Sequence, residues 1–447
     1  MSALPAPLPE RSSLESMVSR VLDAARKQGA TQAEASVSYG HGLTVNVREG
    51  QPESVEFQTD RDLGITVYFG RRSGSASTSD WSEESIRQAV DAACAIARAS
   101  SEDPCNGLAD AERMAKAFPD LDLNHPWALG AEEAIEIART GESSALALDK
   151  RLTRSEGASL DTRHGVSVYA NTHGFVGERR GASHSLGVAV IAEDDDGMQR
   201  DDWFTSARRP QDLEATEAVG RKAGQRALAR LGSRKLSTRT APVLFTAEVA
   251  RGLFGHFIGA ISGGALYRRA SFLLDHVGKQ VFPSFLRIEQ QPFLTRAAGS
   301  ASFDQEGVAT SERVLIDDGV LQGYVLGSYS ARKLGLKSTG NAGGVFNLIV
   351  TPGKKSFDEL VSDMGEGLIV IELLGQGVNT VTGDYSRGAA GFWVENGKIA
   401  HPAQELTIAG NLRDMFLGMQ AVGSDVDTRG NIRSGSVLVD RMTIASG

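Results

Sequence analysis

Short sequence patterns recur at a nearly constant distance in the first half of this chain. The three recurring pairs are HGLTV (residues 41–45) with HGVSV (164–168), LGITV (63–67) with LGVAV (186–190), and Asp80-Trp81 with Asp202-Trp203. Their offsets are 164 − 41 = 123, 186 − 63 = 123 and 202 − 80 = 122. Self-similarity at a fixed spacing is typical of internally repeated structure. We therefore expect this half to contain two copies of one unit.

Each copy combines helical and strand patterns. In the first copy, Ser12 and Glu15 fit a capping box that would start one helix, and Asp80 with Glu83 would start another. The alternating segments between them, bounded by glycines and charges, predict antiparallel strands at 33–39, 43–49, 55–59, 63–70 and 74–78. The second copy repeats this order, with a helix near 131–148, strands at 157–160, 166–170, 175–179, 185–192 and 200–206, and a helix at 213–231.

The composition changes from residue 241, where the chain becomes dense in glycine. Asp318-Gly319 and Asn396-Gly397 lie between apolar runs and predict tight hairpins. Strands are expected at 243–246, 299–303, 313–317, 320–324, 391–395 and 406–409, with helices at 329–334 and 356–364. The predicted fold class is α+β: an internally duplicated α-β(4-5)-α N-terminal half, then a Gly-rich, mostly antiparallel β C-terminal domain. The predicted domains are residues 1–115, 116–235 and 236–447.

One glycine-rich stretch, residues 248–271, has the apolar spacing of a helix. Its five glycines each cost helix stability, roughly 1 kcal/mol relative to alanine. A helix that accepts them is expected to be buried, with another backbone pressed close against it. His256 stands in its middle, but Phe257 follows it where a zinc peptidase would have glutamate, and no second histidine follows within two turns.

Metal and nucleophile motifs are weak elsewhere. No two of the eight histidines are three or four residues apart, so no helical ligand pair is present, and His256 is expected to be a packed or cavity-wall residue. Gly353-Lys354-Lys355-Ser356 departs from a phosphate loop and predicts a strand, a turn and a helix start. No G-x-S-x-G elbow occurs. We expect no catalytic residue and no metal ligand in this chain.

The most suggestive polar cluster is residues 382–388, TGDYSRG. Asp384, Tyr385 and Arg387 could hold an extended peptide through main-chain contacts, or could form a hairpin with an internal Asp–Arg pair. Arg268 could line a cavity or lie at an exposed helix end. With His256, these four residues are the candidates for contact with a peptide.

Composition restricts the class of protein. The 447 residues carry a formal net charge of −9, which argues against a nucleic-acid partner. No run of 18 apolar residues occurs, so no membrane association is expected. The N-terminal stretch MSALPAPLPERSS lacks the pattern of a signal peptide, and Cys94 and Cys105 do not form a disulfide framework. Cys94 falls among core positions of a helix. We expect a cytoplasmic location.

Four segments of the C-terminal half resemble the PmbA/TldE branch of the TldD/TldE metallopeptidase family. They are GHFIGAISGGALYRR (255–269), KSTGNAGG (337–344), ELLGQGVNTVTGDYSRGAAGFWVENGKI (372–399) and ELTIAGNLRDMF (405–416). In that family the TldD-type subunit has H-E-x-x-x-H on the helix that begins this region and a C-terminal cysteine ligand. This chain has only His256 near the first position, as the resemblance to the TldE-type subunit implies.

The resemblance implies a subunit of a cytoplasmic metallopeptidase that acts on unfolded peptides or small proteins. A TldD-type partner would supply a divalent metal, zinc or iron, while this chain would close a shared chamber. Self-association into a homodimer is a further expectation. Two alternatives stay open: an independent peptidase with a non-obvious site, and a non-catalytic peptide-binding or maturation factor.

Overall fold

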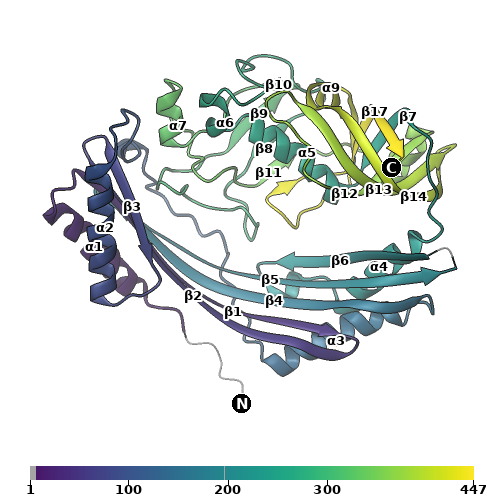
Figure 1. The fold of residues 1–447 in the computed structure, drawn as a ribbon, viewed down its shortest axis with the longest axis horizontal. Coiled ribbons are helices and arrows are strands. Elements are labelled where there is room, and N and C mark those ends of the chain that lie inside the picture. Colours follow the sequence, from purple (N-terminus) through teal and green to yellow (C-terminus); the bar gives the residue numbers. More distant parts are fainter. Residues whose placement is uncertain (1–6, 196, 447) are drawn as a thin grey trace.

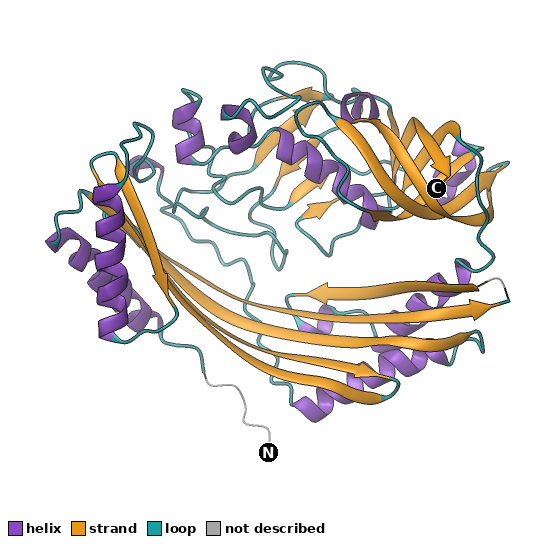
Figure 2. Ribbon diagram, in the orientation of Figure 1, coloured by secondary structure: helices purple, strands orange, loops and turns teal. Residues whose placement is uncertain are grey.

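The computed structural model describes residues 7–195 and 197–446. Its first half is a long curved sheet covered by helices on one face, and its second half is a β-rich body that lies across the other face (Figure 1, Figure 2). The first-half elements are α1 (Arg11–Lys27), β1 (Gln32–Arg48), β2 (Gln51–Phe69), β3 (Arg72–Thr78), α2 (Glu83–Ala99), α3 (Ala131–Leu146), β4 (Leu152–Asn171), β5 (Val176–Asp194), β6 (Gly197–Ala207) and α4 (Thr216–Ala229).

The internal duplication is visible in the strand register. The six strands are antiparallel in the order β3-β2-β1-β4-β5-β6, so the two copies meet at the β1–β4 pair. At that junction His41 lies opposite His164, its own counterpart in the repeat. Val37 pairs with Leu63 in the first copy, and Leu160 pairs with Leu186 at the equivalent positions of the second. A pseudo-twofold axis therefore passes between the two histidines.

The third recurring pair does not follow this symmetry. Asp202 and Trp203 lie inside β6, opposite Ala189 and Val188, whereas Asp80 follows the end of β3. The Asp-Trp recurrence is therefore a coincidence of sequence.

Each copy contains three strands, so the prediction of four or five short ones is wrong. The glycines that suggested turns lie inside long strands: Gly40 and Gly42 in β1 pair with Gly165 and Arg163 of β4. A Cβ at Gly42 would come within 2.8 Å of the Thr162 carbonyl oxygen. These glycines permit close approach of the two central strands.

The two faces of the sheet differ in chemistry. Along β1 the odd-numbered residues from Ala33 to Val47 are buried, except His41, and they pack under the helices. The alternate residues, such as Ser36 and Thr44, face the concave side and are small or polar. The concave face is thus suited to water and polar ligands.

Each of the two helix-covered cores contains part of a strand from the other copy. The core beneath α1 and α2 includes Val166, Val168 and Ala170 from β4 of the second copy. The core beneath α3 and α4 includes Leu43, Val45 and Val47 from β1 of the first copy. Each copy therefore completes its apolar core with part of the other.

The predicted helix starts need two corrections. The capping box at Ser12 is wrong, because the N-cap of α1 is Glu10, two residues earlier, and Glu15 instead accepts a hydrogen bond from Arg11 Nε at 2.6 Å. The cap of α2 is Ser82, whose hydroxyl accepts from the Ser85 N–H, not Asp80. The thiol of Cys94 is fully buried on the inner face of α2, as its position in the apolar pattern predicts.

The C-terminal half contains two sheets and several short helices. Its elements are β7 (Arg239–Phe245), α5 (Ala247–Ala260), α6 (Gly263–Tyr267), β8 (Ile288–Gln290), β9 (Arg313–Asp317), β10 (Val320–Leu321), α7 (Ser328–Lys333), β11 (Leu348–Val350), α8 (Phe357–Met364), β12 (Gly367–Leu374), β13 (Asp384–Glu395), β14 (Lys398–Asn411), α9 (Leu412–Leu417), β15 (Met419–Val422), β16 (Ile432–Arg433) and β17 (Val437–Ser446). The order of the smaller sheet is β10-β9-β8-β11-β16.

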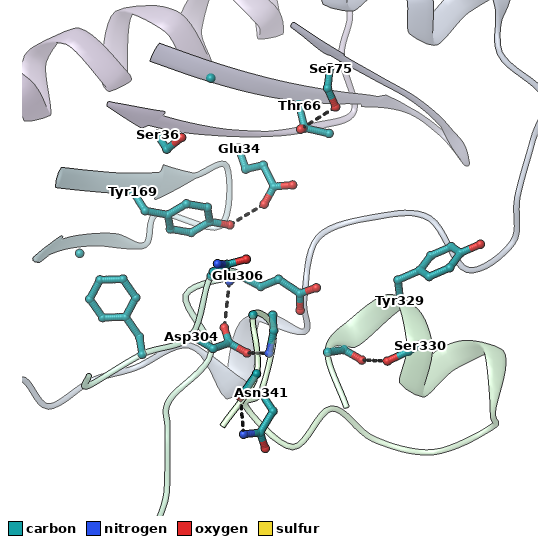
Figure 3. A pocket seen from close by; sticks show the side chains of 18 of the residues that line it. Glu34, Ser36, Thr66, Ser75, Tyr169, Asp304, Glu306, Tyr329, Ser330 and Asn341 are labelled. Carbon is teal, nitrogen blue, oxygen red and sulfur yellow. Dashed lines mark hydrogen bonds between the residues drawn. The ribbon is translucent and has the colours of Figure 1, made fainter. Parts of the chain in front are cut away.

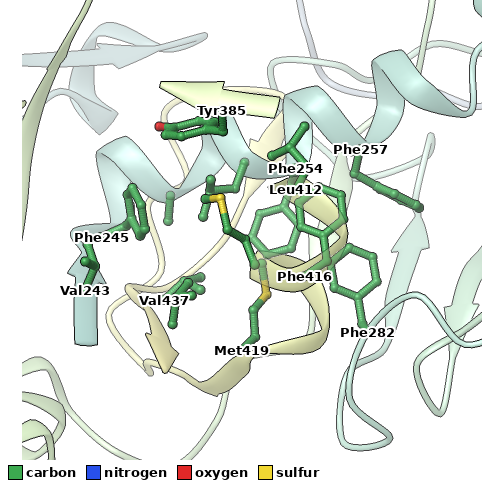
Figure 4. Close-up of a cluster of buried hydrophobic side chains, with 14 of the residues drawn as sticks. Val243, Phe245, Phe254, Phe257, Phe282, Tyr385, Leu412, Phe416, Met419 and Val437 are labelled. Atoms are coloured by element: carbon green, nitrogen blue, oxygen red, sulfur yellow. The ribbon is translucent and has the colours of Figure 1, made fainter. Parts of the chain in front are cut away.

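The larger sheet closes on itself. Its order is β14-β13-β12-β7-β17-β15, and a further pairing of β14 with β17 completes a ring of five strands. The pairs β7–β12 and β11–β16 are parallel, and the other pairs are antiparallel. Beside this ring, α5 packs Phe254 and Phe257 against Phe282 and Phe416 (Figure 4).

Local signals in this half are largely confirmed. Both residues of the Asp318-Gly319 and Asn396-Gly397 turns have positive φ, as such hairpins require. Ser356 caps α8 in a full capping box, so the segment after β11 is a turn and a helix start. The strand expected at 299–303 is wrong, because this segment is a loop whose Phe303 packs against Phe175.

The glycine-rich stretch forms α5 and α6, but the expected close backbone is absent along the described α5. A Cβ at Gly252 or Gly259 would meet no atom within 4 Å, and one at Gly255 would only touch Ile432 at 4.0 Å. Gly263 of α6 is tightly enclosed instead, since an added Cβ would lie 2.1 Å from Ser330 Oγ. The glycine stripe of α5 therefore faces open space. Among the described residues, none of the helices is both long and apolar enough to cross a membrane.

Candidate functional site

A cavity of about 1050 Å³, with many polar residues in its wall, lies between the concave face of the sheet and the C-terminal half (Figure 3). Three groups of residues line it: Glu34, Ser36, Thr66, Ser75, Tyr169 and Arg179 from the sheet, Ile258, Ser262 and Tyr267 from the α5–α6 region, and Phe303, Asp304, Glu306, Tyr329, Asn341 and Gly343 from C-terminal loops and α7. The cavity is large enough for several residues of an extended peptide.

Glu34 is the most deeply held carboxylate on the sheet side of this cavity. Its two oxygens accept hydrogen bonds from the hydroxyl groups of Tyr68 at 3.0 Å and Tyr169 at 2.6 Å. Burial raises the pKa of Glu34, and the two hydroxyl donors oppose part of that rise. Burial and the neighbouring carboxylate also raise the pKa of both tyrosines, so they stay protonated donors.

Asp304 organises the loops on the opposite wall. Its carboxylate accepts from the backbone N–H groups of Glu306, Val308 and Ala342 at 2.9–3.0 Å. Burial raises its pKa to about 6, although the three N–H donors favour the ionised form. Asp304 therefore ties the loop that contains it to residues 337–344.

Glu306 completes a group of three carboxylates around the cavity. Its side chain accepts from the Ser328 N–H at 2.9 Å, and its charge contributes to the raised pKa of Glu34. These acidic residues were not among the predicted site residues. The alternation of β1 already placed Glu34 on the face opposite the buried alanines, but no local pattern in the sequence marks Asp304 or Glu306.

Three of the predicted candidates, His256, Tyr385 and Arg387, do not line this cavity. They come together where α5 meets β13. The rings of His256 and Tyr385 meet edge to face, 6.0 Å apart between centroids. Burial lowers the pKa of His256, and the adjacent Arg387 guanidinium lowers it further. Burial raises the pKa of Tyr385 to about 12, against the opposing charge of Arg387. At neutral pH this group therefore contains a neutral imidazole, a neutral phenol and one cation.

The remaining two candidates lie elsewhere. Asp384 is exposed and accepts hydrogen bonds from Thr382 Oγ1 at 2.6 Å and Asn411 Nδ2 at 3.2 Å. Within the described chain it forms no ion pair with Arg387, so the internal Asp–Arg pair is not formed. Arg268 is exposed at the end of α6 and contacts the hydroxyl of Tyr267.

The surroundings of His256 do not suit a metal ion. Its closest polar neighbours are the Arg387 cation, which would repel one, and a phenol that stays protonated. Across residues 7–195 and 197–446, no three His, Cys, Asp or Glu side chains are grouped as metal ligands would be. The residues of α5 therefore do not fit a catalytic metal site.

Comparison with known families gives matches over nearly the whole chain. The PmbA/TldA metallopeptidase family matches in three consecutive parts: its domain 1 at residues 33–97, its central domain at 124–231 and its C-terminal domain at 238–446. The chain is 50% identical over 436 residues to Metalloprotease PmbA of Escherichia coli O157:H7, covering 98% of this chain and 97% of the relative.

Two proteins of Haemophilus influenzae are similar to this chain, to different degrees. A Metalloprotease PmbA homolog is 46% identical, covering 97% of this chain and 96% of the relative, and a Metalloprotease TldD homolog is 24% identical, covering 85% and 83%. Among solved structures, a candidate modulator of DNA gyrase from Bacteroides thetaiotaomicron has a TM-score of 0.92 at 26% identity, covering 97% of this chain and 99% of that one. TldE from Thermococcus kodakarensis has the same fold, with a TM-score of 0.84 at 20% identity over 96% and 100%.

Proposed function

Because the chain belongs to the PmbA/TldE branch of the PmbA/TldD metallopeptidase family, we propose that it is the subunit of a two-component peptidase that does not hold the metal. A TldD-type partner supplies the metal, zinc or iron, together with the activated water. This chain supplies one wall of a chamber in the cytoplasm that admits unfolded peptides or small proteins. The metal would polarise the scissile carbonyl and activate the attacking water.

The observation that carries this proposal is the environment of α5. The helix presents an open stripe of small residues to the space beneath it, but its one histidine is flanked by Arg387. The open stripe of α5 could thus receive a peptide, whereas His256 and its neighbour Arg387 do not suit a metal ion. The coexistence of a PmbA homolog and a TldD homolog in Haemophilus influenzae supports a division of labour between two chains.

Polar side chains in the wall of the chamber also support a peptide substrate. The concave face carries small polar side chains such as Ser36 and Thr66, which suit a hydrated cavity. The free backbone N–H and C=O groups of a peptide in this cavity can hydrogen-bond to these hydroxyl groups directly or through water. A folded protein is too large for a cavity of about 1050 Å³.

Reconstitution tests the proposal. The purified chain, its TldD-type homologue from the same organism and an equimolar mixture are assayed for bound metal and for cleavage of an unfolded reporter peptide. We expect cleavage by the mixture, metal in the homologue and neither property in this chain alone. Stoichiometric metal with cleavage by this chain alone would instead establish an independent peptidase, and peptide binding with no cleavage by any mixture would favour a binding factor.

A matched pair of variants links cleavage to the chamber. Ser36→Phe places a bulky ring in the cavity, whereas Ser19→Phe places the same ring on the exposed surface of α1. Ser36→Phe should reduce cleavage by the mixture at least severalfold, and Ser19→Phe should not. Equal activity of the two variants would contradict a role for this cavity.

A further inference from the structure

A second cavity, of about 330 Å³, lies at the N-terminal end of α5. It is bounded by β6 and α4 of the second copy and by α5, β12 and β13 of the C-terminal half. Its most unusual property is its content of guanidinium groups, which come from Arg200, Arg226, Arg230, Arg251, Arg387 and Arg429.

Four of these arginines are neutralised by carboxylates. Arg200 pairs with Glu156 at 2.6 Å, and Arg429 pairs with Asp427 at 2.9 Å. Arg200 also pairs with Asp202 at 3.0 Å, and Arg226 pairs with Asp201 at 2.9 Å and with Glu248 at 2.7 Å. Arg230 pairs with Glu372 at 2.8 Å and with Asp201 at 3.5 Å. The six carboxylates of these pairs equal the six arginines in number, but none of them is paired with Arg251 or Arg387.

The other two arginines have no such partner. Arg251 forms no ion pair or hydrogen bond with any residue of the described ranges 7–195 and 197–446, although its charge helps to lower the pKa of Asp427. The contact of Arg387 with the Leu373 carbonyl is long, 3.5 Å, and its Nε is buried without a partner in the described chain. A partly buried cation without a paired carboxylate is costly, so a cavity with two of them favours an anionic ligand.

A neutral donor lies beside one of these cations, Arg387. Tyr385 is 1% exposed, and within the described chain its hydroxyl has no hydrogen-bond partner of good geometry, although it lies close to the Arg387 guanidinium. In Figure 4 its oxygen points away from Phe254, Phe257 and Phe416. His256, in contact with the same ring, is kept neutral and adds no charge to this group.

The helix also leaves room for a ligand. Gly252 lines the cavity with the two arginines and faces space in which a Cβ would meet no atom within 4 Å. The glycine stripe continues from there through Gly259 to Ser262, which lines the larger cavity. From Arg251 to the end of α5 at Ala260 the helix rises roughly 14 Å, the length of about four extended peptide residues.

We propose that Arg251 and Arg387 form a carboxylate-binding subsite, which holds the terminal carboxylate or an acidic side chain of a peptide lying along the open face of α5. The inference rests on the proposed function in one respect, that the ligand is a peptide. A guanidinium group can donate two parallel hydrogen bonds to a carboxylate, a geometry that lysine cannot provide. The subsite would fix one end of the peptide while the rest extends toward the larger cavity.

Peptide binding to the full chain tests the subsite independently of catalysis. Fluorescein-labelled hexapeptides without basic residues are titrated, and Kd is measured by fluorescence anisotropy. One pair differs only in a free or amidated C-terminus, and a second, amidated pair differs only in an internal Glu or Gln. We expect one carboxylate form to bind about 10- to 100-fold more tightly than its amide, which identifies the source of the carboxylate.

Variants assign the effect to the two arginines. Arg251→Gln and Arg387→Gln should bring the acid-to-amide affinity ratio close to one. Arg441→Gln is the matched control, because Arg441 lies in β17, in the same closed sheet as Arg387, but its side chain is 76% exposed and lies outside the cavity. If Arg387→Gln does not fold, Arg251→Gln still tests the subsite, since Arg251 forms no hydrogen bond or ion pair within the described chain.

Two results would overturn the subsite: equal affinity for acids and amides, or an acid preference that survives both substitutions. The failure of the proposed function would be a different result, the absence of cleavage when the two subunits are mixed.

Discussion

The imidazole rings of His41 and His164 meet edge to face, 5.4 Å apart between centroids, at the point where the two copies of the repeat join. Burial lowers the pKa of both, and the His41 charge adds to the effect on His164. Both rings are therefore neutral at pH 7, and protonating either would place a cation against its own counterpart.

This pair predicts a loss of stability in mild acid. A histidine whose folded pKa lies below the ordinary value of 6.5 releases its proton on folding, so the unfolded chain binds protons more readily. The contribution of such a histidine to the free energy of unfolding is fully present above pH 6.5 and decreases as the pH falls below that value. The urea concentration at the unfolding midpoint can be measured at pH values of about 7.5 and 5.5, on either side of the ordinary histidine pKa. The difference between the two midpoints should be smaller in His41→Gln than in the natural chain. His173→Gln, at an exposed position, is the control, and equal differences in both variants would contradict the prediction.

Glu142 should be important for the joining of the two copies. This residue of α3 is 1% exposed, and its carboxylate accepts the backbone N–H groups of Glu49 and Gly50 in the β1–β2 turn at 2.8 and 2.7 Å. Glu142→Gln leaves one acceptor oxygen and places an amide donor against an N–H. We expect a loss of about 1–3 kcal/mol in the free energy of unfolding, measured by urea denaturation. The exposed Glu133→Gln should change it little, and similar values for both would contradict this role.

The open glycine stripe of α5 predicts opposite effects at two nearby glycines. Gly255→Ala should stabilise the chain by about 0.4–1 kcal/mol, because the methyl group meets only Ile432 at 4.0 Å and the helix gains propensity. Gly263→Ala should destabilise it by about 1–3 kcal/mol, because the methyl group would lie 2.1 Å from Ser330 Oγ. Thermal denaturation of both variants provides the comparison. A loss of stability in Gly255→Ala would mean that this face of α5 is covered.

The two cysteines should differ in reactivity. Cys94 is buried in α2 and burial raises the pKa of its thiol, whereas Cys105 is partly exposed in the segment between the copies. Reaction with a thiol-specific chromogenic disulfide should modify one thiol in the native chain and both in guanidinium chloride. The Cys105→Ser variant should show no fast-reacting thiol, and a fast reaction in that variant would contradict the buried position of Cys94.

Much of the fold could be predicted from the sequence because the signals are local. The recurrence of HGLTV and LGITV located the duplication, and the Asp318-Gly319 and Asn396-Gly397 pairs located two hairpins. Strand lengths could not be predicted in this way. Gly40 and Gly165 resemble turn residues in sequence, but in the sheet they allow two backbones to approach, which only the pairing of β1 with β4 reveals.

The candidate site was less predictable. His256, Tyr385 and Arg387 could be selected individually, but their contact joins segments about 130 residues apart and depends on the packing of α5 against β13. Glu34 and Asp304 face one cavity only because the curved sheet lies opposite the C-terminal loops. A carboxylate in a strand or loop is ordinary in sequence, and burial alone makes it chemically distinct.

The exchange of strand halves between the two copies has a consequence for biosynthesis. The core beneath α1 and α2 requires Val166, Val168 and Ala170, so a ribosome must release the chain through β4 before that core can close. Until then the apolar sides of α1 and β1 are exposed, in a nascent chain that already contains every other part of the first copy. We therefore expect this chain to depend on holding chaperones during synthesis. The dependence should be greater than that of a duplicated protein of equal length in which each copy completes its own core.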